Sequence, residues 1–244
     1  MQFTYDSYRD LISLLKKHGY HFADYETWQK YPRCVILRHD IDNDIVRSAE
    51  LGKIERDLGV CSTFFVLLTS DFYNVFSESS GRLLKMIKDC GHQIGLHFDE
   101  ARYPEIKVPE DARDLILREA GLMEKAAGVP INCVSMHRPS KMVLEADLKI
   151  PGMINSYGQT YFKEFKYLSD SRRRWREPVE EIIASEQYNR LHILTHAIWY
   201  NEIEKDIHDT LKSFINCGNR WRYMCESENI TDLSSIMGEE EIAE

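Results

Sequence analysis

The chain has 244 residues, of which 43% are hydrophobic, so it can bury a substantial core in one α/β barrel or in two small domains. Its 31 basic and 40 acidic side chains give a formal net charge of −9, which argues against a general binder of nucleic acid or anionic membranes. No apolar stretch approaches the roughly 20 residues that span a bilayer, and no signal-peptide pattern opens the sequence. The six cysteines form no C-x-x-C pair. We therefore expect free thiols, a cytoplasmic location and no membrane span.

Apolar residues at helical spacing predict a first helix over 6–18, which ends at Gly19. Short apolar runs then alternate with helical stretches, a pattern typical of parallel βαβ units closed into a barrel. The predicted strands are 34–39, 61–68, 92–98, 131–137, 152–157, 165–169 and 190–196. The predicted later helices are 44–58, 78–90, 110–127, 177–186 and 201–217. From about residue 226 the chain becomes acidic, and we expect a frayed tail.

Four apolar runs end on a histidine with polar neighbours. They are Val35–Asp42, Ile94–His97, Cys133–Pro139 and Leu191–His196. Because the carboxyl ends of barrel strands collect functional residues on one rim, these side chains are expected to converge. Imidazoles and carboxylates that converge make a site for a divalent metal and for proton transfer, which indicates a hydrolase.

The stretch Arg38-His39-Asp40-Ile41-Asp42 is too polar to continue a buried strand. Two carboxylates two residues apart can share a site, in which one binds a metal and the other stays free as a base. The alternative is a surface turn whose aspartate caps the helix that begins near Asp44.

The other three runs also have two interpretations each. His97 and His137 are candidate ligands, although a histidine at a strand end is often only structural. Arg138 can hold a catalytic aspartate by a bidentate pair or can form a structural salt bridge. His196 can donate a proton or can be a hydrogen-bonded core histidine.

Arg172-Arg173-Arg174-Trp175-Arg176 is the only basic cluster in this acidic chain, and it follows a predicted strand. Such a charge run is commonly a solvated loop. Its functional interpretation is a clamp for a phosphate or carboxylate of the substrate.

The order and spacing of these runs over residues 33–200 resemble the polysaccharide deacetylase superfamily, which includes the deacetylases of carbohydrate esterase family 4. The resemblance implies a distorted (β/α)7 TIM-like barrel in a single domain spanning 1–244, with a core of about 33–217. Residues 1–32 would form a helical extension and 226–244 an acidic tail. It also implies a divalent metal cofactor, most often Zn²⁺.

The family's first motif, T-F-D-D-G, corresponds to residues 38–42 with one residue inserted. By this resemblance Asp40 is the base and Asp42 a metal ligand. The first half of the second motif, G-H-E-I-G-N-H-[ST]-x-x-H, matches Gly91–His97, so His97 is the first histidine ligand by this resemblance. The last histidine of the motif falls at Ala101, which cannot bind a metal. We favour His137 as the third ligand. Asp99, Glu100, a water molecule or loss of the metal are the alternatives.

The remaining motifs match more loosely. Arg138-Pro139 matches the arginine–proline pair that orients the base, and Leu194-Thr195-His196 matches the motif that carries the general acid, His196. The fourth motif, an aspartate followed by a pocket tryptophan, is similar to Asp170 and Trp175. The predicted substrate-binding residues are Asp170, Arg174, Trp175 and Trp199.

The function that the resemblance implies is metal-dependent removal of an N-acyl group from an amino sugar. A cytoplasmic member would act on a small, nucleotide-linked or lipid-linked precursor of a surface glycan, not on nucleic acid. The alternatives are a non-catalytic carbohydrate-binding relative, which Ala101 favours, and an amidohydrolase of a small non-sugar amide.

Overall fold

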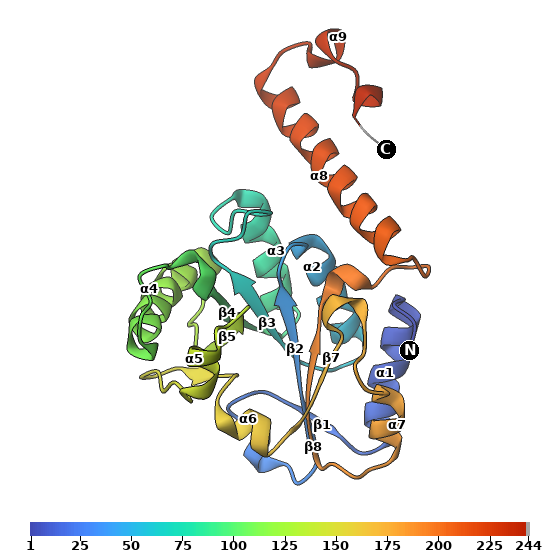
Figure 1. The fold of residues 1–244 in the computed structure, drawn as a ribbon. Helices are drawn as coiled ribbons and strands as arrows, with labels where there is room; N and C mark the ends of the chain where they lie inside the picture. Colours follow the sequence, from blue (N-terminus) through green and yellow to red (C-terminus); the bar gives the residue numbers. More distant parts are fainter. Residues whose placement is uncertain (243–244) are drawn as a thin grey trace. The chain divides into compact units, whose positions relative to one another are not determined.

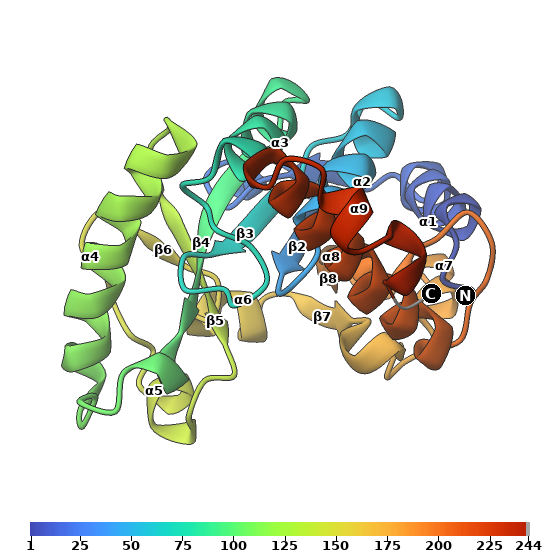
Figure 2. The same cartoon turned by 90° about the horizontal axis from the view of Figure 1, so that it is seen from above.

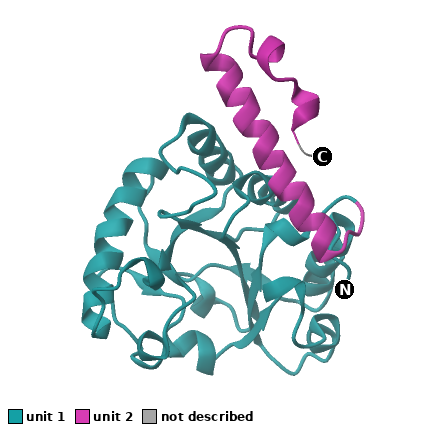
Figure 3. Ribbon diagram, turned by 45° about the horizontal axis from the view of Figure 1, so that its top comes forward, with its two compact units in different colours: residues 1–202 teal, residues 203–244 magenta. Residues whose placement is uncertain are grey.

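The computed structural model describes residues 1–242, and the chain divides into two compact units (Figure 3). The first unit is Met1–Glu202, and the second begins at Ile203. The second unit contains α8 (Ile207–Asn229), α9 (Leu233–Ile236) and a 3-10 turn at Glu239–Glu241. The predicted core of 33–217 therefore overlaps both units, and much of the predicted acidic tail is helical. Residues 243–244 of that tail lie outside the described part.

The first unit is built on a parallel sheet of eight strands. The strands are β1 (His21–Ala23), β2 (Cys34–Ile41), β3 (Thr63–Leu67), β4 (Gln93–Asp99), β5 (Cys133–His137), β6 (Ile154–Asn155), β7 (Lys166–Ser169) and β8 (Arg190–Thr195). Seven of them follow the order β6-β5-β4-β3-β2-β8-β7, and β1 pairs with the first half of β2. β6 and β7 stand at opposite ends of this order and do not pair, so the sheet is open, and it curls into a half-barrel (Figures 1 and 2). This confirms the predicted α/β class and the distorted (β/α)7 barrel.

Helices connect the strands, as the alternating sequence pattern predicts. The helices of the first unit are α1 (Tyr5–Lys17), α2 (Ile45–Asp57), α3 (Glu78–Asp89), α4 (Pro109–Ala127), α5 (Lys141–Glu145), α6 (Gln159–Lys163) and α7 (Val179–Ala184). The side chain of Asp44 accepts a hydrogen bond from the backbone N–H of Arg47 and so caps α2. Since Asp44 fills the capping position, Asp40 and Asp42 are not needed there.

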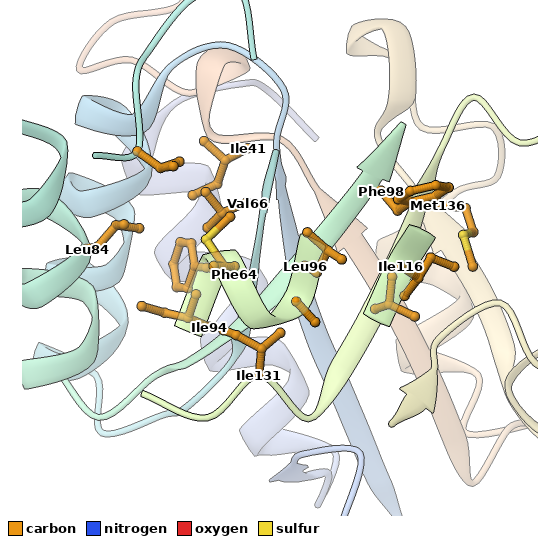
Figure 4. Close-up of a cluster of buried hydrophobic side chains, with 14 of the residues drawn as sticks. Ile41, Phe64, Val66, Leu84, Ile94, Leu96, Phe98, Ile116, Ile131 and Met136 are labelled. Carbon is orange, nitrogen blue, oxygen red and sulfur yellow. The ribbon is translucent and has the colours of Figure 1, made fainter. Parts of the chain in front are cut away.

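Side chains alternate between the two faces of each strand. On the helix side, one buried apolar cluster joins strands β3–β5 to α3 and α4 and includes Phe64, Leu84 and Ile116 (Figure 4). A second cluster joins β2 and β8 to α1 and α7. Each fully buried side chain of this size contributes about 1.5–3 kcal/mol relative to its exposed state. The other face of the curled sheet is its concave face. A smaller apolar cluster that includes Ile36 of β2 and Phe65 of β3 lies there.

The concave face is tightly packed at Gly95 on β4. A Cβ atom placed there would lie 2.6 Å from ring atoms of Phe65 and 2.9 Å from the Sγ of Cys133. Only glycine fits at this position without a shift of its neighbours. The glycine of the second sequence motif therefore has a steric role two residues before His97.

Residues 1–32 are an integral part of the first unit rather than a separate extension. Tyr8 and Leu11 of α1 are buried in the second cluster. The backbone N–H of Tyr5 donates to the carbonyl of Asn201 at 2.9 Å, and that of Asn201 donates to the carbonyl of Phe3 at 3.2 Å. Thr4 and Asn201 thus form a parallel bridge between the beginning and the end of the unit.

Helices in the described residues are too short or too polar to cross a bilayer. All six cysteines are free, and Cys34 and Cys133, which lie in apolar runs of the sequence, are buried.

Candidate metal centre

The register of the parallel strands brings the sequence-predicted residues together at the carboxyl edge of the sheet. Asp40 lies near the end of β2, and Asp42 follows that strand. His97 lies on β4, and His137 is the last residue of β5. His196 directly follows β8, which pairs with β2. The convergence therefore follows from the parallel topology, in which all strand ends point the same way.

Asp42, His97 and His137 form a compact group of three ligand atoms. The Oδ1 atom of Asp42 lies 3.2 Å from the Nε2 of His97 and 3.2 Å from the Nδ1 of His137. The two imidazole nitrogens are 3.1 Å apart. Ligands about 2.1 Å from a tetrahedral zinc ion lie about 3.4 Å from one another, so the spacing suits such an ion.

The Oδ1 atom of Asp42 is buried and has no hydrogen-bond partner of good geometry. A buried carboxylate oxygen without such a partner is unusual and needs an explanation. Burial raises the pKa of Asp42, but the imidazoles of His137 and His97, each 3.2 Å away, outweigh this effect and hold the pKa well below its usual range. The donor set of one carboxylate and two imidazoles fits a divalent transition metal.

The alternatives for the third ligand are occupied by other partners. Asp99 is buried, and its Oδ2 atom accepts a hydrogen bond from Arg138 at 2.6 Å. An oxygen of Glu100 accepts a hydrogen bond from the backbone N–H of Ser140 at 2.7 Å. Neither carboxylate belongs to the compact group of ligand atoms, whereas His137 stands beside Asp42 and His97.

His196 forms a pair with a buried carboxylate. Its Nδ1 atom lies 2.6 Å from the Oδ1 of Asp170, and its backbone N–H donates to the Oδ2 of Asp170 at 3.1 Å. The hydroxyl of Tyr200 donates to the same Oδ2 at 3.2 Å. Burial lowers the pKa of His196, but the hydrogen bond and charge of Asp170, with the charge of Asp42, raise it to about 9. The free Nε2 atom of His196 lies 3.8 Å from Asp42 Oδ2.

The structure does not place Arg138 beside Asp40. The Arg138 side chain is 63% exposed and is bonded to Asp99. Arg138 follows the end of β5 with a left-handed φ of 48°, and it lies next to the end of β4, where Asp99 stands. The guanidinium that contacts Asp40 belongs instead to Arg38, whose Nη2 atom donates to Asp40 Oδ2 at 2.7 Å.

Sequence reasoning missed Arg38, although a signal was present. Arg38 and Asp40 are two residues apart on a strand, so they must share a face. Ser135, two residues before His137, shares the same face and accepts from Arg38. Tyr157, after β6, lies with its ring over the guanidinium and is the other missed neighbour.

The four predicted substrate-binding residues differ in how buried they are and in what they contact. Asp170 is fully buried and bonded to His196, so it positions that imidazole and does not line a surface. Arg174 is exposed. Trp175 and Trp199 are half-buried and pack against the second apolar cluster.

No family model and no curated protein matches this chain. Solved structures with a similar fold include a family 4 acetyl xylan esterase from Clostridium thermocellum in complex with a cobalt ion. It is 16% identical, with 74% of this chain and 81% of that chain covered and a TM-score of 0.44. A family 4 carbohydrate esterase from Bacillus anthracis is 18% identical, with 85% and 84% covered and a TM-score of 0.44. A family 4 pseudoenzyme from the same organism is 16% identical, with 77% and 63% covered and a TM-score of 0.44.

All three of these structures are named as members of family 4 of the carbohydrate esterases. The similarity concerns the fold. The chemistry of the site rests on the residues of this chain.

Proposed function

We propose that this protein is a metal-dependent hydrolase that removes an N-acyl group, most simply acetyl, from an amino sugar. The observation that carries the proposal is the convergence of Asp42, His97 and His137 beside a second carboxylate, Asp40, and a second imidazole, His196. The group supplies three metal ligands, a base and an acid, which together are the components of hydrolysis of an amide.

Asp42, His97 and His137 would hold the metal, which we propose to be Zn²⁺. When bound, such an ion supplies Lewis-acid polarisation of the acyl carbonyl and makes a water molecule more acidic. Asp40 lies next to this group, since its Oδ2 atom is 3.7 Å from the Nε2 of His97. Its carboxylate would take the proton of the attacking water.

His196 would protonate the departing amine. Its Nδ1 atom is taken by Asp170, so the Nε2 atom is the one that faces the site. The hydrogen bond and charge of Asp170 raise the pKa of this imidazole, which favours the protonated form that a general acid requires. Without that proton the tetrahedral adduct would expel the hydroxyl rather than the amine. Asp170 acts through His196 and is a positioning residue.

We extend the proposal to a cytoplasmic substrate in which a nucleotide or lipid phosphate is attached to the amino sugar. Arg172, Arg174 and Arg176 are exposed on the chain that follows β7. Guanidinium groups suit a phosphate. Arg174, Trp175 and Trp199 stay proposed contacts of the substrate.

A second candidate function is binding of a carbohydrate without catalysis. Ala101 favours it, because this residue stands where the family motif has a metal-binding histidine. A hydrolase of small non-sugar amides is the remaining alternative.

The test begins with the metal content of the purified protein, measured by elemental mass spectrometry. We expect about one equivalent of a divalent metal in the wild type and in His21→Ala, a control at an exposed histidine of β1. His97→Ala and His137→Ala should each lose it. Absence of metal in the wild type after reconstitution with Zn²⁺, Co²⁺ or Mn²⁺ would contradict the proposal.

The metal-loaded protein is then assayed for release of acetate. N-acetylated amino sugars, free and as sugar nucleotides, are compared with simple acetamides. Release from the sugars alone supports the proposal, release from the simple amides alone favours the small-amide hydrolase, and binding without release favours the non-catalytic alternative.

A further inference from the structure

We propose that Arg38 is the positioning residue for Asp40 and that Arg138, the arginine of the matching motif, is not. The inference rests on the proposed function, in which Asp40 is the base. It assigns the orientation of that base to a residue on the same strand and explains why Arg138 is bonded elsewhere.

Arg38 is a fully buried cation whose hydrogen bonds reach three side chains. Its Nη2 atom donates to Asp40 Oδ2 at 2.7 Å and to the Oγ of Ser135 at 2.8 Å. Its Nη1 atom donates to the Oγ of Ser156 at 2.9 Å. Neither Arg38 nor Asp40 has more than 4% of its side chain exposed. A buried charge is stable only when it is paired and hydrogen-bonded, so this geometry is strongly imposed.

Two aromatic rings fix the plane of the guanidinium. The Cζ atom of Arg38 lies 5.2 Å from the ring centroid of Phe65 and 5.2 Å from that of Tyr157. Contacts of a guanidinium with ring faces are favourable and orient it. With its plane set and both terminal nitrogens bonded, Arg38 presents one N–H group to one oxygen of Asp40.

The contacts of Arg38 also cross the concave face of the sheet. Strands β3 and β4 separate β2 from β5 in the strand order, and β6 lies beyond β5. Arg38 on β2 nevertheless reaches Ser135 on β5 and Ser156 just after β6. Ser135 is two residues before His137, on the same face of the strand. Arg38 therefore ties the base to the strand that carries a proposed metal ligand.

Arg138 has the opposite surroundings. Its side chain is 63% exposed and its Nη2 atom donates to Asp99 at 2.6 Å. A single exposed guanidinium bonded to another carboxylate cannot orient Asp40. The two arginines thus make a matched pair for a test.

The experiment compares Arg38→Lys with Arg138→Lys, since both keep the positive charge and lose the planar fork of donors. In the metal-loaded enzyme we expect Arg38→Lys to lower kcat by roughly 10²-fold with KM and metal content near the wild-type values. Arg138→Lys should change kcat by less than about threefold, because no contact to the base is lost. Equal losses, or a larger loss in Arg138→Lys, would overturn the assignment.

Crystal structures of the two variants give a readout that does not depend on activity. In Arg38→Lys the carboxylate of Asp40 should rotate or become disordered, while His97 and His137 keep their positions. In Arg138→Lys it should stay as it is. If Asp40 does not move in Arg38→Lys, the positioning role is wrong, even in an active enzyme. If the Asp40 carboxylate moves in Arg38→Lys but the wild-type enzyme has no deacetylase activity, the proposed function fails and the positioning role of Arg38 stands.

Ser156→Ala serves if Arg38→Lys does not fold. It removes one acceptor of Arg38 and leaves the contact to Asp40 intact. We expect a fall in kcat of a few-fold and weaker order of both side chains in the crystal. Wild-type kcat together with unchanged positions of Arg38 and Asp40 would count against the proposal.

Discussion

The two faces of strand β2 carry buried polar groups that differ in how completely they are bonded. On the helix side, the Nδ1 of His39 is 2.7 Å from the hydroxyl of Thr195 and its Nε2 is 2.9 Å from Glu55 Oε1. The other oxygen of Glu55 accepts from Ser62 at 2.6 Å, and Tyr8 also donates to Glu55. Burial raises the pKa of Glu55, but the charge and hydrogen bond of His39 outweigh this effect and lower it. This cluster is complete by itself.

On the concave side the ligand atoms point at one another instead. The Oδ1 of Asp42 has no hydrogen-bond partner of good geometry, and it converges with the Nε2 of His97 and the Nδ1 of His137. Native proteins pair nearly all buried polar atoms. A complete cluster therefore indicates a structural role, and an incomplete, convergent one indicates a site for a ligand.

Glu119 on α4 shows that one unpaired oxygen is not sufficient evidence of a ligand. Its Oε2 atom is buried without a partner, and Tyr103 donates to its other oxygen. Burial raises the pKa of Glu119 to about 7. Burial thus favours the neutral form of this carboxyl group, whereas the pKa of Asp42 is lowered and two imidazoles lie beside it.

The largest effect is expected on the concave side, for Asp40→Asn. Loss of the base should lower the rate of deacetylation by about 10²–10⁴-fold. The melting temperature should also fall, because the buried Arg38 loses its charged partner even though the amide oxygen can still accept its hydrogen bond. Steady-state kinetics and thermal denaturation of the metal-loaded protein measure both. Retention of full activity would remove Asp40 from the mechanism.

On the helix side, Glu55→Ala should act on stability and not on the metal. It removes a buried charge partner of His39, and we expect a loss of about 3–5 kcal/mol in the free energy of unfolding. Urea denaturation measures it, with Glu50→Ala on the exposed face of α2 as a control that should change by less than about 0.5 kcal/mol. If Glu55→Ala lost metal but no stability, the helix side of β2 would be the metal site and not a structural cluster.

Glu119→Gln should stabilise the protein in a pH-dependent manner. The pKa of Glu119 is raised in the folded state, so the wild type loses stability as the pH rises from about 4.5, the ordinary value, through about 7. The substitution removes that loss, and we expect a gain of roughly 1–3 kcal/mol at pH 8 and little change at pH 4. Urea denaturation at both pH values measures the difference. Equal effects at the two pH values would show that Glu119 is not protonated on folding.

The smallest effect is expected for Thr195→Val, which keeps the shape of the side chain and removes the partner of His39 Nδ1. Leaving one nitrogen of a buried imidazole unpaired should cost about 1–2 kcal/mol in the free energy of unfolding. Ser185→Ala, at an exposed position after α7, is the control. An unchanged stability would mean that the cluster does not depend on this bond.

The fold was largely predictable because its signals are local. Apolar runs located the seven strands of the half-barrel within a few residues, and helical periodicity located α1 to α4. The short elements that were missed include β1, α5 and α6, because three to five residues carry too little periodic signal. The packing of residues 1–32 into the first unit depends on contacts with distant segments, which local patterns do not contain.

The candidate site was predictable only as far as strand ends reveal it. Asp42, His97 and His137 could be named because parallel strands end at one edge. The partner of His196 could not be assigned in the same way. Asp40 was paired with Arg138 although Arg38, two residues before it on the same strand face, was the available signal. Arg138 turns to Asp99 through a left-handed backbone at the strand end, and Asp170 meets His196 across 26 residues of sequence. Such pairings are set by tertiary packing.

The bridge between Thr4 and Asn201 makes the first unit nearly continuous in space from its beginning to its end. Two backbone hydrogen bonds hold the adjoining residues, so a linker of a few residues could join them covalently without moving either one. New ends could then be opened in the exposed loop before α4, near Lys107. The unit should accept circular permutation there, since permuting the chain order preserves every pairing in the half-barrel.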